Sequence, residues 1–225
     1  MDGIFWVGLL EVVWINIILS GDNAVVIALA CKDLPDRQRL IGMIMGAGVA
    51  ILLRVVFTLM VATLLDLPFL RLAGGALLVW IAIKLVTDEA GDDDHIRSSD
   101  QLWYAVRTVA IADAVMSLDN VLAIAAVARD SRVMLVLGLI ISIPLIVAGA
   151  SLIMKLLEKL PILVWAGAAL LGWLAGDMML NDPVVKRLIG ADAVHRFELP
   201  IEVIGALFVI GIAYLIRRTR PVAAA

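Results

Sequence analysis

Two aspartate–asparagine pairs lie inside long apolar stretches of the chain, where charged side chains are otherwise scarce. The first pair is Asp22-Asn23 and the second is Asp119-Asn120. A carboxylate in a hydrocarbon environment is costly, so it needs either a partner or a function. Because the costly pair occurs twice in similar surroundings, the sequence predicts that these residues carry chemistry.

The polar side chains around the two pairs offer oxygen ligands and no nitrogen or sulfur ligand of histidine or cysteine. His95 and His195 lie in hydrophilic joints, and Cys31 is at a helix end. Oxygen ligands suit hard divalent cations such as Mn²⁺, Ca²⁺ and Mg²⁺ better than Zn²⁺ or Cu²⁺. The candidate metal ligands are Asp22, Asn23, Asp113, Asp119 and Asn120, with Glu11 and Asn16 nearby.

The alternative is structural: each aspartate caps a broken helix and accepts a hydrogen bond from the backbone. Ser20 to Asn23 is poor helix material, because glycine loses backbone entropy and the polar side chains compete for backbone hydrogen bonds. We therefore expect a helix break there, which would turn Asp22 toward the other polar residues. The second copy has Leu118 where the first has Gly21, so the two copies need not break alike.

Arg54 also lies within an apolar stretch and has no counterpart in the matching segment of the second half. One hypothesis is a structural ion pair with Glu11 or with one of the aspartates. The other is a gating role, in which the guanidinium stands in for the cation when the site is empty.

The composition indicates a membrane protein. Of 225 residues, 63% are hydrophobic and 17% are charged, whereas soluble domains are close to half apolar. The net charge of −3 gives no indication of a nucleic-acid partner. No Gly-Lys-Ser/Thr nucleotide motif and no catalytic signature occur, so we expect neither an enzyme nor a tightly bound cofactor.

A membrane-spanning helix needs ~20 mainly apolar residues, and seven stretches qualify. They run approximately over 4–30, 40–65, 69–87, 102–129, 133–157, 161–180 and 200–217. The joints on one side hold more lysine and arginine, which predicts that this side, with the C-terminus, is cytoplasmic and that the N-terminus is outside.

The first three stretches recur as the next three. The two aspartate–asparagine pairs match, and Leu67-Pro68 matches Leu160-Pro161. An odd number of spans inverts the second copy in the membrane, which is typical of transporters. We therefore predict an all-α integral membrane protein with seven transmembrane helices, formed by two inverted three-helix repeats and one extra C-terminal helix. The expected parts are 1–90 (first repeat), 91–101 (acidic cytoplasmic loop), 102–182 (second repeat) and 183–225 (a loop and the seventh helix).

At Ser20-Gly21-Asp22-Asn23-Ala24 and Ser117-Leu118-Asp119-Asn120-Val121 the sequence resembles the TerC family, within the LysE-type transporter superfamily. The resemblance implies export of Mn²⁺ from the cytoplasm, with the acidic motif of the family on Asp22 and Asp119. The compact form of the chain resembles bacterial members, which implies a multi-pass protein of the inner (plasma) membrane. The expected partners are a divalent ion and the lipid bilayer, and homo-oligomer formation is left open.

A second hypothesis concerns a different class of function. The protein could be a membrane factor that assists the assembly or metallation of other membrane or exported proteins without transporting ions itself. This hypothesis predicts a co-purifying partner and no ion flux.

Overall fold

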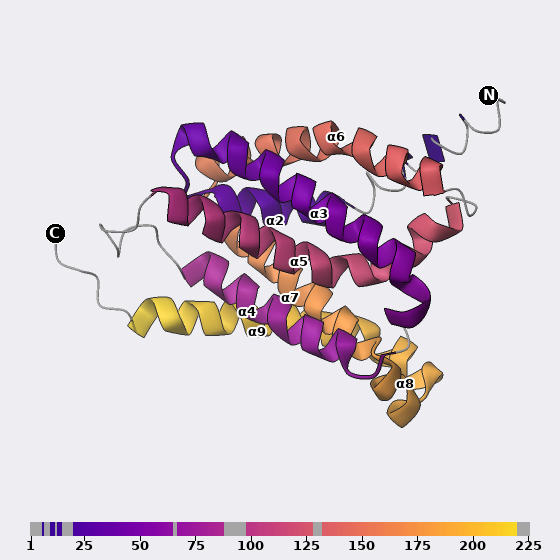
Figure 1. Ribbon diagram of the computed structural model, residues 1–225. Coiled ribbons are helices and arrows are strands. Elements are labelled where there is room, and N and C mark those ends of the chain that lie inside the picture. The colour runs from indigo at the N-terminus through magenta and orange to yellow at the C-terminus, as the bar shows by residue number, and fades with distance from the viewer. Residues whose placement is uncertain are drawn as a thin grey trace. The chain divides into compact units, whose positions relative to one another are not determined.

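The computed structural model describes residues 6, 10, 11, 13, 14, 20–64, 67–87, 98–127 and 132–219. The side chains of 58–64, 98, 99, 118–127, 132–135 and 191 lie outside this description. Every regular element within the described ranges is a helix (Figure 1). The predicted all-α class is therefore confirmed.

The described helices follow one another along the chain. They are α2 (Gly21–Cys31), α3 (Asp36–Leu64), α4 (Leu70–Thr87), α5 (Ser98–Val127), α6 (Arg132–Lys159), α7 (Ile162–Leu180), α8 (Pro183–Ile189) and α9 (Ala191–Thr219). Within the described residues, α3, α4, α6, α7 and α9 contain stretches long and apolar enough to cross a membrane. The count of seven spans and the inverted repeat stay predictions.

The structure differs from the sequence expectation around 183–199. This range was expected to be a hydrophilic joint, but it holds α8 and the first turns of α9, which continues through Pro200. Similarly, α5 begins at Ser98, inside the predicted loop 91–101. Hydropathy detects the part of a helix that matches the hydrocarbon layer, so polar turns that extend a helix beyond that layer are missed.

The chain divides into two compact units. The first contains Met1–Leu67 and His95–Lys159, and therefore α2, α3, α5 and α6. The second contains Pro68–Asp94 and Leu160–Ala225, and therefore α4, α7, α8 and α9. Each unit thus contains helices from both predicted repeats. The boundaries of the repeats stay predictions.

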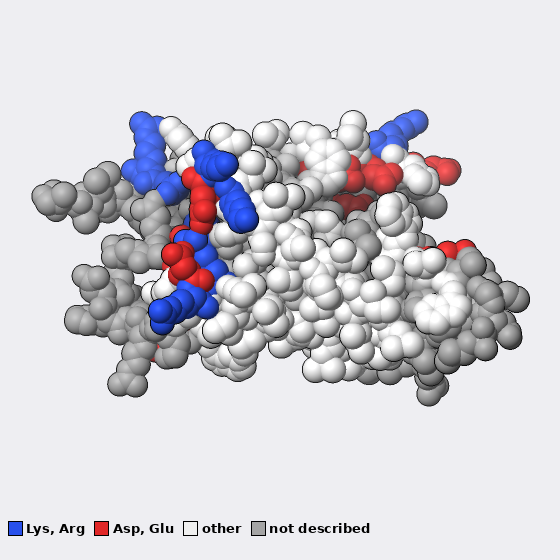
Figure 2. Space-filling view, turned by 90° about the horizontal axis from the view of Figure 1, so that it is seen from above, with Lys and Arg blue, Asp and Glu red and all other residues white. Residues whose placement is uncertain are grey.

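Ion pairs gather at the end of the first unit where α2 ends and α3 begins. Lys32 lies 3.1 Å from Asp33, and Arg39 pairs with Asp36 at 3.2 Å and with Glu158 at the end of α6. Figure 2 shows a group of blue and red side chains at the left of the view and another at the upper right, with a broad white surface between them. Exposed ion pairs of this kind contribute at most ~1 kcal/mol to the free energy of folding. Their charged side chains give this end of the unit a hydrophilic surface.

Within the second unit, α7 and α9 approach so closely that their backbones touch (Figure 1). A Cβ atom added to Gly205 would lie 2.3 Å from the carbonyl oxygen of Gly172, and one added to Gly176 would lie 2.7 Å from that of Ile201. Small residues permit this approach in membranes, where close packing replaces the hydrophobic effect as a driving force. The glycines therefore set the α7–α9 crossing.

Asp182, which has no exposed surface, joins the start of α8 to the start of α4. Its Oδ1 accepts the N–H groups of Val184 (2.8 Å) and Phe69 (3.3 Å), and its Oδ2 accepts that of Leu72 (3.2 Å). Phe69 has a φ of 64°, a conformation that is rare for a bulky residue, and the bond to Asp182 helps to hold it. Burial alone would raise the pKa of Asp182, but the backbone N–H donors outweigh it and hold the pKa below its ordinary value.

We predict that Gly205→Ala lowers the free energy of unfolding by about 1–3 kcal/mol, because the added methyl group meets the Gly172 backbone. Thermal unfolding of the purified protein in detergent measures the effect. Gly211→Ala is the matched control on the same helix, since a Cβ atom there meets nothing within 4 Å. Equal stability of the two variants would contradict the proposed contact.

We predict that Asp182→Asn costs about 1–2 kcal/mol at neutral pH, which is the range for loss of a helix cap. The folded pKa lies below the unfolded value of ~3.9. The contribution of the carboxylate is therefore complete above about pH 4 and is lost as the pH falls through the folded pKa.

The measurement is the difference in unfolding temperature between wild type and Asp182→Asn as the pH is lowered. This difference should shrink under acid conditions. Asp192→Asn, at an exposed position in the first turn of α9, is the control. A difference that stays constant with pH would argue against a carboxylate held in its charged form.

Candidate metal-ion site

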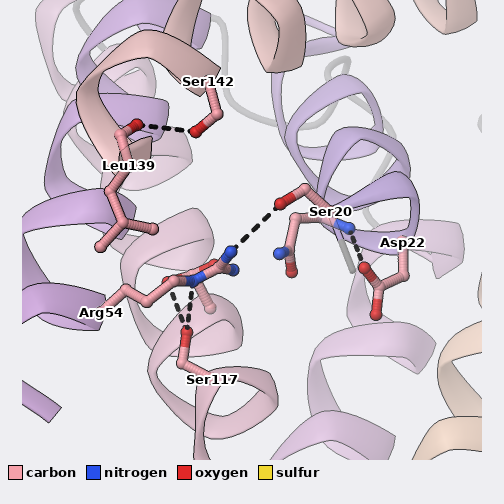
Figure 3. Close-up of polar contacts among 8 residues, drawn as sticks. Ser20, Asp22, Arg54, Ser117, Leu139 and Ser142 are labelled. Carbon is pink, nitrogen blue, oxygen red and sulfur yellow. Dashed lines mark hydrogen bonds and ion pairs between the residues drawn. The ribbon is translucent and has the colours of Figure 1, made fainter. Parts of the chain in front are cut away.

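A buried arginine lies at the centre of a polar cluster in the first unit (Figure 3). Arg54 of α3 is 1% exposed, and its Nη2 donates to Oδ1 of Asp113 in α5 at 2.9 Å. Its Nη1 donates to Oγ of Ser20 at 3.1 Å, and its Nε donates to Oγ of Ser117 at 3.3 Å. One guanidinium therefore connects α3, α5 and the residue that precedes α2.

Asp113, which is 3% exposed, uses both oxygens of its carboxylate. Oδ1 accepts from Arg54, and Oδ2 accepts the hydroxyl of Ser117 at 3.0 Å. Of the two hypotheses for Arg54, an ion pair with one of the aspartates is thus confirmed, and the partner is Asp113. The same contacts also agree with the second hypothesis, in which the guanidinium of Arg54 takes the place of the cation when the site is empty.

The first motif lies at a helix start. α2 begins at Gly21, and Ser20 has φ −116° and ψ 5°, outside the helical region. The Asp22 carboxylate, in the first turn, accepts the N–H of Asn23 at 2.8 Å (Figure 3). A negative charge is favourable at this end of a helix. The helix start agrees with the predicted break, and the backbone bond of Asp22 is the contact that the structural alternative predicted.

The second motif lies within a continuous helix. α5 runs from Ser98 to Val127 and passes through Ser117 to Asn120 without interruption. The two copies therefore differ in backbone, as the change from Gly21 to Leu118 indicated. The side chains of Asp119 and Asn120 lie outside the described residues, so their role stays a prediction.

Three of the candidate ligands belong to the described cluster or to the turn beside it: Asp22, Asn23 and Asp113. Asp22 interacts electrostatically with Arg54 and with Asp113. Asn23 is 4% exposed, and neither its side-chain oxygen nor its side-chain nitrogen has a hydrogen-bond partner in the described part of the chain. Because buried polar groups are nearly always hydrogen-bonded, this amide is a strong candidate for contact with a ligand.

The remaining candidates are not brought into the cluster by the described contacts. Glu11 is half-buried, and its part in the site stays a prediction. Asn16 lies outside the described residues. Cys31 is a free, fully buried cysteine in α2.

One acidic group, in the second unit, was not predicted from the sequence. Carboxylate oxygens of Asp177, Glu198 and Glu202 lie within 4.8 Å of one another, and Asp177 also accepts the side-chain N–H of Asn181 at 2.7 Å. The four-residue spacing of Glu198 and Glu202 was a visible signal, but their approach to α7 depends on helix packing. We assign no ligand to this group, because only the carboxylates themselves point to one.

Comparison with known proteins gives a consistent family assignment. Residues 1–221 match the family model described as "Integral membrane protein TerC family". Membrane protein YjbE of Bacillus subtilis (strain 168) is 38% identical over 95% of this chain and 98% of its own length. YceF of the same strain is 26% identical over 79% of this chain and 72% of its own length. The UPF0053 inner membrane protein YoaE of Escherichia coli (strain K12) is 30% identical over 54% of this chain and 27% of its own length. No solved structure matches the chain significantly.

We predict that Arg54→Met lowers the free energy of unfolding by about 3–5 kcal/mol, because it leaves the Asp113 carboxylate buried without its cation. The double variant Arg54→Met/Asp113→Leu should recover most of this loss, since a pair of apolar side chains leaves no uncompensated charge. Thermal unfolding of the single and double variants in metal-free buffer makes the comparison. Additive losses in the double variant would disprove the coupling of the pair.

Proposed function

Because the chain belongs to the TerC family of integral membrane proteins, we propose that it is a transporter that exports a divalent cation from the cytoplasm, with Mn²⁺ as the first candidate. The observation that carries the proposal is the gathering of buried oxygen ligands in one helical unit. Asp113 and Asn23 are nearly inaccessible, and Asp22 interacts electrostatically with Asp113. Such a group is difficult to explain as a purely structural feature of an apolar fold.

The chemistry of the ligands suits a divalent ion. Two carboxylates, Asp22 and Asp113, balance the charge of one M²⁺, and the Asn23 amide adds a neutral oxygen. These are hard ligands, which favour Mn²⁺, Mg²⁺ or Ca²⁺. The choice of manganese among these ions rests on the resemblance of the two motifs to the TerC family. Asp119 and Asn120, farther along α5, would complete the ligand set from the second motif.

The proposed transporter has a defined membrane location and orientation. The protein would lie in the inner membrane with its N-terminus outside and its C-terminus in the cytoplasm, so that the charged end at Lys32 and Arg39 faces the cytoplasm. Transport would need no covalent chemistry by the chain, and a pH gradient across vesicles would show whether protons move in exchange.

We predict that the purified protein in lipid vesicles moves Mn²⁺, and that Asp22→Asn and Asp119→Asn each reduce the flux at least about tenfold, since weaker changes around metal ligands already cost this much in affinity. A manganese-sensitive dye inside the vesicles measures the flux. Asp33→Asn, at the exposed carboxylate that follows α2, is the matched control.

The outcome also distinguishes the two hypotheses. Full flux in both Asp22→Asn and Asp119→Asn would exclude these residues as ligands. An absence of flux of Mn²⁺, Mg²⁺ and Ca²⁺ in the wild type, together with a protein partner that co-purifies, would favour a factor for assembly or metallation instead.

A further inference from the structure

We propose that Arg54 is a built-in competitor of the transported cation, and that its guanidinium and the cargo occupy Asp113 alternately. This inference rests on the transport function proposed above and concerns the regulation of the same site. Arg54 of α3 would thus set the affinity for the cation and would return the site to its unloaded state after the cation has left.

The contacts of Arg54 resemble those that a bound cation would make. Its nitrogen atoms meet a carboxylate oxygen of Asp113 and the hydroxyl oxygens of Ser20 and Ser117, at 2.9, 3.1 and 3.3 Å (Figure 3). These acceptors come from two different parts of the chain, the start of α2 and the middle of α5. A positive charge therefore already occupies the oxygen-rich position that a metal ion would use.

The charges favour alternation over joint occupancy. Asp22 and Asp113 together carry two negative charges, of which Arg54 offsets one. Among the described side chains, the charge of a divalent ion bound by Asp22 and Asp113 is balanced if the guanidinium leaves Asp113. If the guanidinium stayed, two cations would share a buried carboxylate in a medium of low dielectric constant, where their repulsion is strong.

The buried side-chain amide of Asn23 is a second observation in favour of alternate occupancy by Arg54 and a cation. Its amide lies in the first turn of α2, three residues after Ser20, is 4% exposed, and has no hydrogen-bond partner in the described part of the chain. Arg54 satisfies Ser20, Ser117 and Asp113 but leaves this amide unsatisfied. An incoming cation would accept the Asn23 oxygen as a ligand, so the arrangement with Arg54 on Asp113 corresponds to the unloaded state.

Competition of this kind sets the apparent affinity. A cation that binds only after Arg54 has left Asp113 has an apparent Kd equal to the intrinsic Kd divided by the fraction of protein in that open state. Minor states of this type are populated at about 0.1–10%. Removal of the guanidinium should therefore lower the Kd for a divalent ion at least about tenfold.

The test compares Arg54→Gln with wild type, using the full chain in detergent and Mn²⁺ as the probe. Equilibrium binding gives the Kd. The unfolding temperature as a function of Mn²⁺ concentration gives a second readout, because a ligand stabilises the folded state by RT ln(1 + [L]/Kd). We expect at least about tenfold tighter binding and a larger Mn²⁺-dependent rise in unfolding temperature for Arg54→Gln. Arg37→Gln, an exposed arginine on the same helix, should match wild type.

Each outcome has a defined consequence. Equal or weaker binding by Arg54→Gln, while wild type binds and transports Mn²⁺, would overturn the competition and leave the transport function in place. No binding and no flux in wild type would overturn both. If Arg54→Gln does not fold, Arg54→Lys decides: lysine keeps the positive charge but lacks the planar guanidinium that reaches Asp113, Ser20 and Ser117 at once. It should tighten Mn²⁺ binding, and an unchanged Kd would overturn the proposal.

Discussion

The first unit is organised around the burial of a guanidinium. A charged side chain that is 1% exposed inside a set of apolar helices must be neutralised and hydrogen-bonded locally. Arg54 meets this requirement with Asp113, Ser117 and Ser20, so α3, α5 and the start of α2 must keep the positions that bring these groups together. The polar contacts thus give the apolar helices one specific arrangement, which hydrophobic packing alone would define less sharply.

The two aspartate–asparagine motifs show how similar sequences can adopt different backbone settings. The first opens α2, where the N–H groups of the first turn have no carbonyl of a preceding turn to bond, and the Asn23 N–H bonds to the Asp22 carboxylate instead. The second lies inside α5, where backbone groups are already used by the helix. The glycine of the first motif and the leucine of the second account for this difference, because glycine favours a helix end and leucine favours a helix interior. A site built from both motifs would therefore have unequal halves.

The second unit is held together by other means. Glycines let the backbones of α7 and α9 touch, and one buried carboxylate, Asp182, stabilises the start of α8 and the start of α4 at once. Backbone contact and capping both act over short distances and tolerate little change in side-chain size. The described contacts of this unit are thus close backbone packing and a helix cap, while the described cluster of buried polar side chains around Arg54 belongs to the first unit.

The sequence by itself determined the helical membrane class, the two motifs with their oxygen-bearing side chains, the helix start near Ser20-Gly21 and the need of Arg54 for an acidic partner. These features depend on composition, hydropathy and local backbone preference, which are readable along the chain. Only the tertiary structure decided that the partner is Asp113, 59 residues away, and that Asp182 bonds to Phe69 across 113 residues. Such choices depend on where helices cross, and the energy of a crossing comes from the packing of surfaces that no local pattern encodes.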